Sequence, residues 1–339
     1  VHPNDHVNMG QSSNDTFPTA MQIAGAGAIK LELVPALKVL ARTLRSLAKK
    51  WDRHVKIGRT HLQDATPIRV GQEFSGFAAQ AEYAVTRAER AMVRLAENLP
   101  IGGTAVGTGI NTHPRFGAIV ARRLSKLTGV KFAEAANHFE AQATRDCVVE
   151  ASGELKTIAV SLSKIANDVR WLGSGPRCGL GELRLPATQP GSSIMPGKVN
   201  PVMSEMVTMV AAQVIGNDAA ITIGGERGNL ELNVMIPVLV HNLLESVEIL
   251  STGSRTFADR CVAGITANAE VCMRYAETTG SLSTALAPVI GYDKAAEVAK
   301  RSLKEDKTLR QVVRDMKLMS DEELDAIIDF AKMTAPNVV

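Results

Sequence analysis

Most of the chain repeats apolar and polar positions with the period of an α-helix. Apolar residues recur at this spacing over residues 34–48 and 74–99, and the longest stripe covers residues 147–169. This stripe predicts one helix over residues 137–172, which would be about 54 Å long at ~1.5 Å per residue. Residues 207–215 are apolar on nearly every side, so a helix there must be surrounded by protein. The pattern predicts an all-α fold of long packed helices.

The pattern changes after a further long periodic segment, residues 234–250. From about residue 269 the segments are shorter and carry more charge, which predicts a small C-terminal helical domain. Two pairs there have the spacing of capping boxes: Thr308 with Gln311, and Ser320 with Glu323. The long helices have little polar surface, which favours a bundle that completes its burial in an oligomer. A monomeric bundle is the alternative.

The composition supports helices and argues against two kinds of partner. Only 4% of the 339 residues are aromatic whereas 45% are hydrophobic, so the core must be aliphatic and rich in alanine, which favours helix-on-helix packing. The net charge is +3 and basic residues are mixed with acidic ones, which argues against nucleic acid as a partner. The sequence has no run of about eighteen apolar residues, so we expect no membrane partner.

The cysteines and the first residues bear on the location of the protein. The four cysteines, at 147, 178, 261 and 272, form no C-x-x-C pair. We therefore expect buried free thiols in a reducing compartment, either the cytoplasm or, in a eukaryote, the mitochondrial matrix. The chain begins VHPNDHVN, without an initiator methionine or a signal-peptide pattern, so we expect its natural N-terminus to lie upstream.

The stretch GSSIMPGKVNP, residues 191–201, carries two serines, a lysine and an asparagine. It does not fit a phosphate loop, because the wrong number of residues separates its glycines and a valine follows the lysine. It also lacks the G-x-S-x-G spacing of a nucleophile elbow. We expect a flexible loop before a helix with Asn200 as N-cap and Pro201 as first helical residue. Loop amides, Lys198 and the positive helix end could stabilise a serine oxyanion and make the serine a base. A surface loop with solvated serines is the alternative.

Two other polar stretches contain candidate site residues. GRTHLQDATP places Thr60 and His61 just ahead of a helix, although a lone histidine is more often a core residue than a catalyst. HPNDHVNMGQSSND could hydrogen-bond a carboxylate at several points, or could form only turns and a cap. Its two histidines are four residues apart, but Pro3 argues against a helix that carries both as metal ligands. We therefore expect no metal site.

Together these stretches closely resemble class II fumarases, in the fumarase/aspartase superfamily. The resemblance rests on HPNDHVN, QSSNDTFPTAM, GRTHLQDA and GSSIMPGKVNP, and it continues through GGTAVGTGIN, IANDVRWLGSGPRCGLGE and IGYDKAAEVAK. Two features favour fumarases within the superfamily. Aspartases typically have Gln in place of His61, and QSTND in place of QSSND.

The resemblance implies a long-helix bundle of the fumarase/aspartase type in three parts. Residues 1–10 would be the remnant of an N-terminal domain, residues 11–269 the central helical bundle, and residues 270–339 the small C-terminal helical domain. Members of the family carry a further N-terminal domain with a Gly-Ser-Gly-Thr motif, so we expect that this domain is missing from the chain. They form homotetramers in which each active site is shared between subunits.

The resemblance also implies the reaction, which is reversible trans-elimination of water from (S)-malate to give fumarate, with no metal or organic cofactor. Ser192 resembles the family's base, and His61 with Glu205 resembles its His–Glu pair. The substrate-binding positions match Ser12, Ser13, Asn14, Thr60, Ser193, Lys198, Val199 and Asn200. The second, non-catalytic anion site matches His2, Pro3, Asn4 and Asp5. Two alternatives stay open: aspartate ammonia-lyase or another superfamily lyase, and a catalytically inactive structural or binding scaffold.

Overall fold

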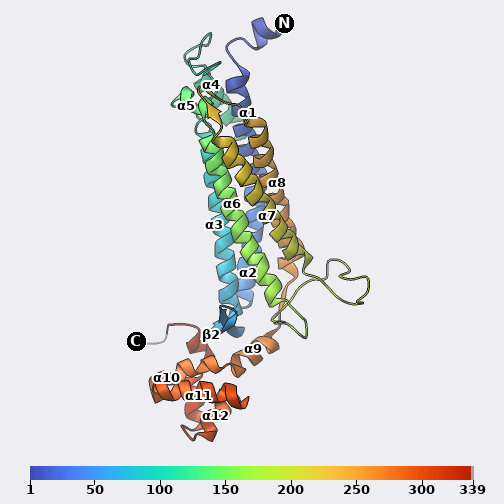
Figure 1. Ribbon diagram of the computed structural model, residues 1–339, viewed down its shortest axis with the longest axis vertical. Coiled ribbons are helices and arrows are strands. Elements are labelled where there is room, and N and C mark those ends of the chain that lie inside the picture. The colour runs from blue at the N-terminus through green and yellow to red at the C-terminus, as the bar shows by residue number, and fades with distance from the viewer. Residues whose placement is uncertain (337–339) are drawn as a thin grey trace. The chain divides into compact units, whose positions relative to one another are not determined.

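The computed structural model describes residues 1–336, and it is mainly helical (Figure 1). The chain divides into two compact units. The first comprises Val1–Arg42, Ala79–Arg170 and Ala187–Ala263. The second comprises Thr43–Ala78, Trp171–Pro186 and the described residues from Gly264 onward. The three predicted domains, 1–10, 11–269 and 270–339, stay a prediction.

Long helices dominate the chain, as the periodicity predicts. They are α1 (Ser13–Ala28), α2 (Val34–Lys50), α3 (Val70–Ala96), α6 (Asp146–Leu172), α7 (Val202–Gly225) and α8 (Ile236–Arg260). A π-helical turn over Ile29–Leu33 joins α1 to α2. In the first unit, α7 packs along α8 and α1 packs against α8. The shorter helices α4 (Phe116–Thr128) and α5 (His138–Ala143) belong to the same unit.

Aliphatic stripes make the contacts between these helices. On α6, Leu155, Ile158 and Ile165 are at most 1% exposed, which confirms the predicted stripe. Burial of one such side chain contributes roughly 1.5–3 kcal/mol. Gly25 lets α1 approach closely, because a Cβ there would lie 2.9 Å from the Leu243 side chain. The predicted aliphatic core is therefore confirmed.

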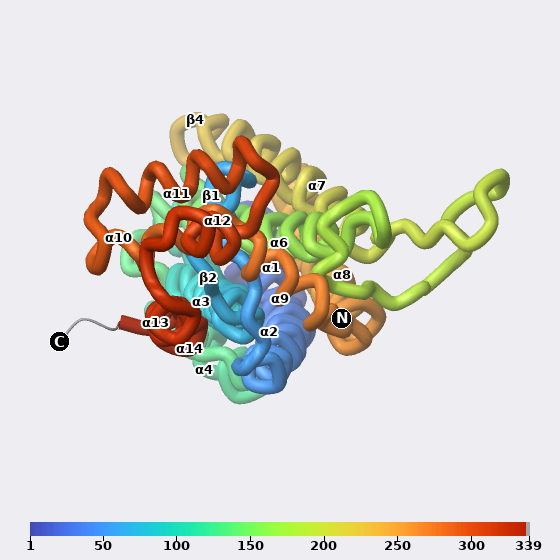
Figure 2. The backbone as a smooth tube through the Cα atoms, turned by 90° about the horizontal axis from the view of Figure 1, so that it is seen from below, coloured from blue at the N-terminus to red at the C-terminus, as the bar shows by residue number. Residues whose placement is uncertain are grey.

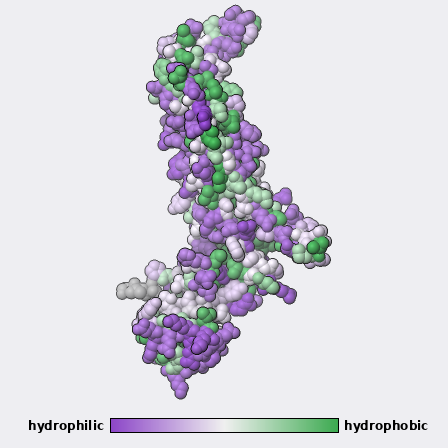
Figure 3. Space-filling model, viewed as in Figure 1, coloured by the Kyte–Doolittle hydropathy of each residue, from purple (hydrophilic) through white to green (hydrophobic). Residues whose placement is uncertain are grey.

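The apolar helix α7 is incompletely buried by its own chain. One side is buried through Val207 and Val214, whereas Met209, Ile215 and Ile223 are 67%, 45% and 53% exposed. Figure 3 shows that apolar side chains reach the surface of the long helices in a strip. By length and composition alone, α7 is long and apolar enough to cross a membrane. No other helix within residues 1–336 meets both conditions. One such helix is weak evidence, because the core helix of a soluble protein has the same properties.

Short antiparallel strand pairs join the helices. They are β1 (Val55–Thr60) with β2 (Gln63–Arg69), β3 (Leu183–Arg184) with β6 (Thr266–Ala267), and β4 (Gly228–Asn229) with β5 (Leu232–Asn233). In the second unit the rings of Trp51 and Phe74 meet edge to face, with centroids 4.8 Å apart. This aromatic contact supports the ends of the helices that flank the β1–β2 hairpin.

The C-terminal part consists of short helices, as predicted. They are α9 (Ala269–Thr278), α10 (Ser283–Ile290), α11 (Tyr292–Glu305), α12 (Leu309–Asp315), α13 (Asp321–Ile327) and α14 (Phe330–Met333). Leu286, Val298, Leu309 and Leu324 are fully buried in its core. Both predicted capping boxes, at Thr308 and at Ser320, are present.

The prediction of one helix over residues 137–172 is wrong. The helix breaks between α5 and α6, where Thr144 is extended at φ −117° and ψ 178°. The Arg145 guanidinium donates to the carbonyl oxygens of Ala141 and Thr144. In the continuous helix that the sequence predicts, these oxygens would instead accept hydrogen bonds from the backbone N–H groups four residues later. A second boundary also differs, because α8 continues to Arg260, ten residues beyond the predicted 234–250 segment.

Candidate active site

The serine stretch 191–201 forms a loop that projects ahead of α7 (Figure 2). The Asn200 side chain closes its neck, because its Nδ2 donates to the Gly191 carbonyl oxygen at 2.8 Å. A Cβ at Gly191 would lie 2.2 Å from the Lys198 carbonyl oxygen, so the neck requires glycine. Most residues beyond the neck are exposed, including Ser193 and Val199.

Ser192 has hydrogen-bond donors around its hydroxyl oxygen. Its Oγ accepts hydrogen bonds from the backbone N–H groups of Met195, at 3.0 Å, and Ile194, at 3.3 Å. Donors aimed at a hydroxyl oxygen stabilise its deprotonated form, which favours its use as a base. Ser192 and Lys198 line the same hollow of about 400 Å³ inside the loop. The structure therefore brings the predicted base and the predicted cation together.

The start of α7 differs from the prediction. Pro201 occupies the N-cap position and Val202 is the first helical residue, so Asn200 does not cap the helix. The reason is that the Asn200 side chain turns back to hold the loop neck. Glu205 lies half-buried in the first helical turn, and its carboxylate makes no hydrogen bond or ion pair within residues 1–336.

Thr60 and His61 lie at the tip of the β1–β2 hairpin, and not directly ahead of a helix as predicted. Thr60 pairs with Gln63, so His61 and Leu62 alone form the turn. Both have left-handed backbone, with φ of 54° and 60°, as in the type I′ turns that join paired strands. The turn leaves Thr60 and His61 exposed. The sequence hides this hairpin because the turn contains neither Asn nor Gly.

The SSND run caps α1 and ties it to a second loop. The Ser12 hydroxyl accepts a hydrogen bond from the backbone N–H of Asn14. The Ser12 N–H donates to the Asp15 carboxylate at 2.9 Å, as in a capping box. Asp15 is fully buried, and its Oδ2 accepts from the N–H groups of Gly102 and Thr104, both at 3.0 Å. Asn14 donates to a carbonyl of the same loop at 2.8 Å. Ser13 is exposed.

The residues of the predicted second anion site form a single helical turn that begins at Pro3. Proline is tolerated at the first helical position, and His2 lies outside the turn as its N-cap, so the helix does not carry both histidines. The His2 Nδ1 accepts from the N–H groups of Asn4 and Asp5, at 3.2 and 3.1 Å. Asn4 and Asp5 line a hollow of about 780 Å³ together with Ser12. The structure thus places this turn beside the SSND run.

The predicted residues fall in both compact units. Thr60 and His61 belong to the second unit, and the other predicted site residues belong to the first. Within the described residues, no three His, Cys, Asp or Glu side chains gather as a metal site would require. All four cysteines are free, but Cys178 is exposed and Cys147 is half-buried, against the prediction that all are buried.

Comparison with known proteins identifies the family. A family model described as lyase matches residues 1–216, and one described as fumarase C C-terminus matches residues 282–335. The class II fumarate hydratase of Mycobacterium tuberculosis is 56% identical over 338 residues, which cover 98% of this chain and 71% of that protein. The class II fumarate hydratase of Nitrosomonas europaea is 54% identical over 334 residues, which cover 98% of this chain and 72% of that protein. The chain belongs to the class II fumarase family.

Solved structures in and near the class II fumarase family have the same fold. The class II fumarase from Schistosoma mansoni superposes with a TM-score of 0.96 at 40% identity, over 100% of this chain and 74% of its own. A fumarate lyase:delta crystallin from Brucella melitensis, bound to cobalt, superposes with a TM-score of 0.94 at 44% identity. The match covers 99% of this chain and 72% of that one. The predicted helical fold and the predicted enzyme class, a lyase, are therefore confirmed.

In this class II fumarase, sequence reasoning missed several charged residues that hold the elements on which predicted site residues lie. Asp15, Lys56 and Glu182 are at most 2% exposed, and Arg59 is largely covered. A usable signal existed for Asp15, because it stands at capping-box spacing from Ser12. The other three give no local signal, because their partners are distant in the sequence.

Proposed function

We propose that this chain catalyses the reversible trans-elimination of water from (S)-malate to give fumarate, without a metal or organic cofactor. The observation that carries the proposal is the environment of Ser192, whose Oγ accepts from two backbone amides and shares a hollow with Lys198. The relatives named fumarate hydratase support the choice of substrate over aspartate.

Ser192 is the proposed base, and it removes the proton from the carbon beside a carboxylate. The negative charge that develops spreads into that carboxylate, which becomes an aci-carboxylate. Lys198, Asn200 and the backbone amides of Ser193 and Val199 stabilise this charge through charge-assisted hydrogen bonds. The side-chain NH₂ of Asn200 has two hydrogens. One bonds to the Gly191 carbonyl oxygen at the loop neck, and the other is left for this role.

His61 and Glu205 act on the hydroxyl side of the substrate. Elimination beside a carboxylate needs a base on one face and an acid on the other. A carboxylate next to an imidazole raises its basicity and fixes its tautomer, and Glu205 has no partner of its own in the described part of the chain. In the proposal, His61 of one copy pairs with Glu205 of another and protonates the leaving hydroxyl through a water.

The neutral polar residues bind the two substrate carboxylates. A dianion bound next to a developing charge needs many neutral hydrogen bonds and few cations. Ser12, Ser13, Asn14 and Thr60 supply hydroxyl and amide donors for this purpose. The turn formed by His2, Pro3, Asn4 and Asp5 is the proposed second anion site, which takes no part in the reaction.

The proposed active form is a homotetramer whose sites are shared between copies. The apolar face of α7 supports this assembly, because Met209, Ile215 and Ile223 need cover that the single chain does not provide. Sedimentation tests the assembly directly. Mixing inactive Ser192→Ala and His61→Asn proteins tests the sharing, because random reassembly restores both residues to about a quarter of shared sites. The proposed compartment is the cytoplasm, or the mitochondrial matrix if the source is eukaryotic.

Turnover of malate and fumarate by the purified chain tests the reaction. The ultraviolet absorbance of the fumarate double bond should grow when malate is added, and this growth should be lost in Ser192→Ala. Release of ammonia from aspartate, without turnover of malate, would identify an aspartate ammonia-lyase instead. Failure to convert either acid would support the inactive scaffold.

A further inference from the structure

The turn that presents His61 is held in a strained conformation. His61 and Leu62 both have positive φ, a region that bulky side chains rarely adopt. Strain of this kind persists where the surrounding contacts leave the backbone no alternative. The contacts that hold the β1–β2 hairpin therefore determine how its imidazole is presented.

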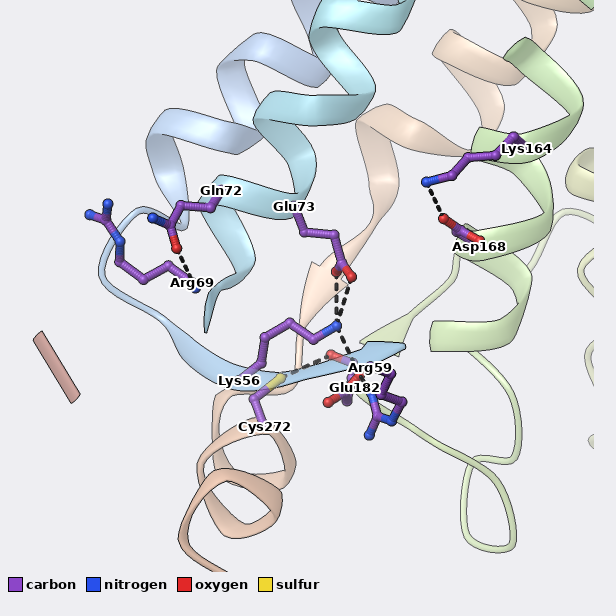
Figure 4. Close-up of polar contacts among 9 residues, drawn as sticks. All are labelled: Lys56, Arg59, Arg69, Gln72, Glu73, Lys164, Asp168, Glu182 and Cys272. Carbon is purple, nitrogen blue, oxygen red and sulfur yellow. Dashed lines mark hydrogen bonds and ion pairs between the residues drawn. The ribbon is translucent and has the colours of Figure 1, made fainter. Parts of the chain in front are cut away.

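A buried network of charges provides these contacts (Figure 4). The Lys56 Nζ lies 2.9 Å from both carboxylate oxygens of Glu73 and 3.3 Å from Oε2 of Glu182. The Arg59 Nη1 lies 2.8 Å from the same Glu182 oxygen. The Lys56 and Glu182 side chains are 3% and 1% exposed, so salt in the solvent screens these ion pairs little. Two cations face two carboxylates, and the network is balanced in charge.

Arg59 connects this network to the tip of the hairpin. It directly precedes Thr60, and its guanidinium carbon lies 5.6 Å from the centre of the Tyr275 ring. The strand register shifts between Ile57 and Arg59, and such an irregularity re-aims the side chain that follows it. The carboxylate of Glu182 and the aromatic ring together fix the residue next to the turn.

The environment of Glu182 indicates a role beyond stability. Its Oε1 is buried and has no hydrogen-bond partner within residues 1–336. A buried carboxylate oxygen without a partner lowers stability, so a network selected for stability alone would satisfy it. Directly before β3, the Glu182 carbonyl oxygen accepts from the Asn268 N–H at 2.8 Å, and Ser192 follows ten residues later. The same residue thus anchors the start of the segment that leads to the serine loop.

We propose that Glu182 is a positioning residue for the reaction. Through Arg59 it fixes the orientation in which the hairpin presents Thr60 and His61. This inference rests on the proposed function, because it assigns His61 to the chemical step. Most of the proposed substrate carboxylate contacts come from the serine loop and the SSND run, so loss of the Glu182 charge affects catalysis more than binding.

The kinetic test compares Glu182→Gln with Asp52→Asn. Both replace a carboxylate that pairs with an arginine of the same hairpin, but Asp52 pairs with Arg69 at its base, 3.0 Å away. With rates normalised to the folded fraction, Glu182→Gln should lower kcat about 10- to 100-fold and change KM less than about threefold. Asp52→Asn should leave both within about twofold of wild type. Arg59→Lys, which keeps the cation, should recover most of the kcat that Arg59→Gln loses.

Hydrogen exchange tests the position of the hairpin without relying on turnover. Glu182→Gln should speed exchange of the amides in residues 55–69, and Asp52→Asn should do so much less. A wild-type chain that fails to convert malate would overturn the proposed function, whereas the exchange would still report whether Glu182 holds the hairpin. The positioning role is wrong if Glu182→Gln matches Asp52→Asn in kcat and in exchange. Should Glu182→Gln fail to fold, Arg59→Gln decides by the same two measurements.

Discussion

The two elements that carry the proposed acid and base are held in opposite ways. The hairpin with His61 is anchored by the buried ion pairs of Lys56 and Glu182, and a hydrogen bond of 2.5 Å from the Ser281 hydroxyl to the Ala65 carbonyl holds its second strand. The loop with Ser192 is closed at its neck by one side chain, and its Ile194 is 84% exposed. Burial and charge therefore fix one element, whereas the other has few contacts outside itself.

This contrast fits the different demands of the two groups. A base on a closing loop must move so that substrate can enter and product can leave, and such loops come from the least stable parts of a fold. An imidazole that must meet its carboxylate and a water in one geometry gains from a rigid support. In the proposal, the group that must move and the group that must be placed precisely therefore lie on two elements that are far apart in the sequence.

Ser192→Ala tests the loop side of the contrast and should have the largest effect. We expect kcat to fall by roughly 10³-fold, within the range for loss of a general base. The melting temperature should stay unchanged, because among residues 1–336 the Ser192 hydroxyl bonds only with amides of its own loop. Turnover and thermal melts of both proteins check this. A fall in kcat of less than about tenfold would mean that another group removes the proton.

Lys56→Met tests the hairpin side. It leaves the Glu73 and Glu182 carboxylates with one cation fewer, and breaking a buried pair of this kind costs about 3 kcal/mol. Lys38→Met is the matched control, because Lys38 pairs with Glu89 on the surface and such pairs contribute about 0.5 kcal/mol. Urea unfolding at equal protein concentration measures both. Equal losses in the two variants would show that the network does not anchor the hairpin.

The helices could be predicted because their signals are local. The stripe on α6 repeats over many turns, and the capping boxes at Thr308 and Ser320 need only residues three positions apart. The break at Thr144 could not be predicted, because the Arg145 side chain competes there for helix carbonyls. Periodicity carries no information about such competition.

The sequence proposes the residues of the candidate site, which stay a prediction, but it does not reveal the contacts that hold them. Motifs supplied Ser192 and His61, yet the amides that face the serine come from the folded shape of the loop. Arg59 and Glu182 are 123 positions apart, and no spacing rule joins charged residues at that distance. The hairpin was missed because its turn is strained and lacks the usual turn residues.

Leu62→Gly sharpens the contrast by removing strain from the anchored side. Leu62 has φ 60° and is 65% exposed, so glycine relieves the backbone while little burial is lost. Glycine also adds conformational entropy to the unfolded chain, which offsets part of this relief. We therefore expect a net gain of about 0.5 kcal/mol in unfolding free energy. Leu303→Gly, at an exposed position inside α11, should instead lose about 1 kcal/mol. If both variants are destabilised alike, the turn is not strained.

Cysteine labelling probes the same contrast with the smallest disturbance. Cys178 is exposed in the turn that precedes Glu182, whereas the Cys272 thiol contacts the Glu182 carbonyl oxygen at 3.7 Å. Burial raises the pKa of Cys272 to about 12, and the Glu182 carboxylate acts in the same direction. Because a raised pKa keeps the group as a thiol, only ~10⁻⁴ of Cys272 is reactive thiolate at pH 8. Iodoacetamide should therefore label Cys178 in the folded protein and spare Cys272, as peptide masses will show. Rapid labelling of Cys272 would mean that the segment around Glu182 opens as readily as the serine loop, and the hairpin would then have no rigid anchor.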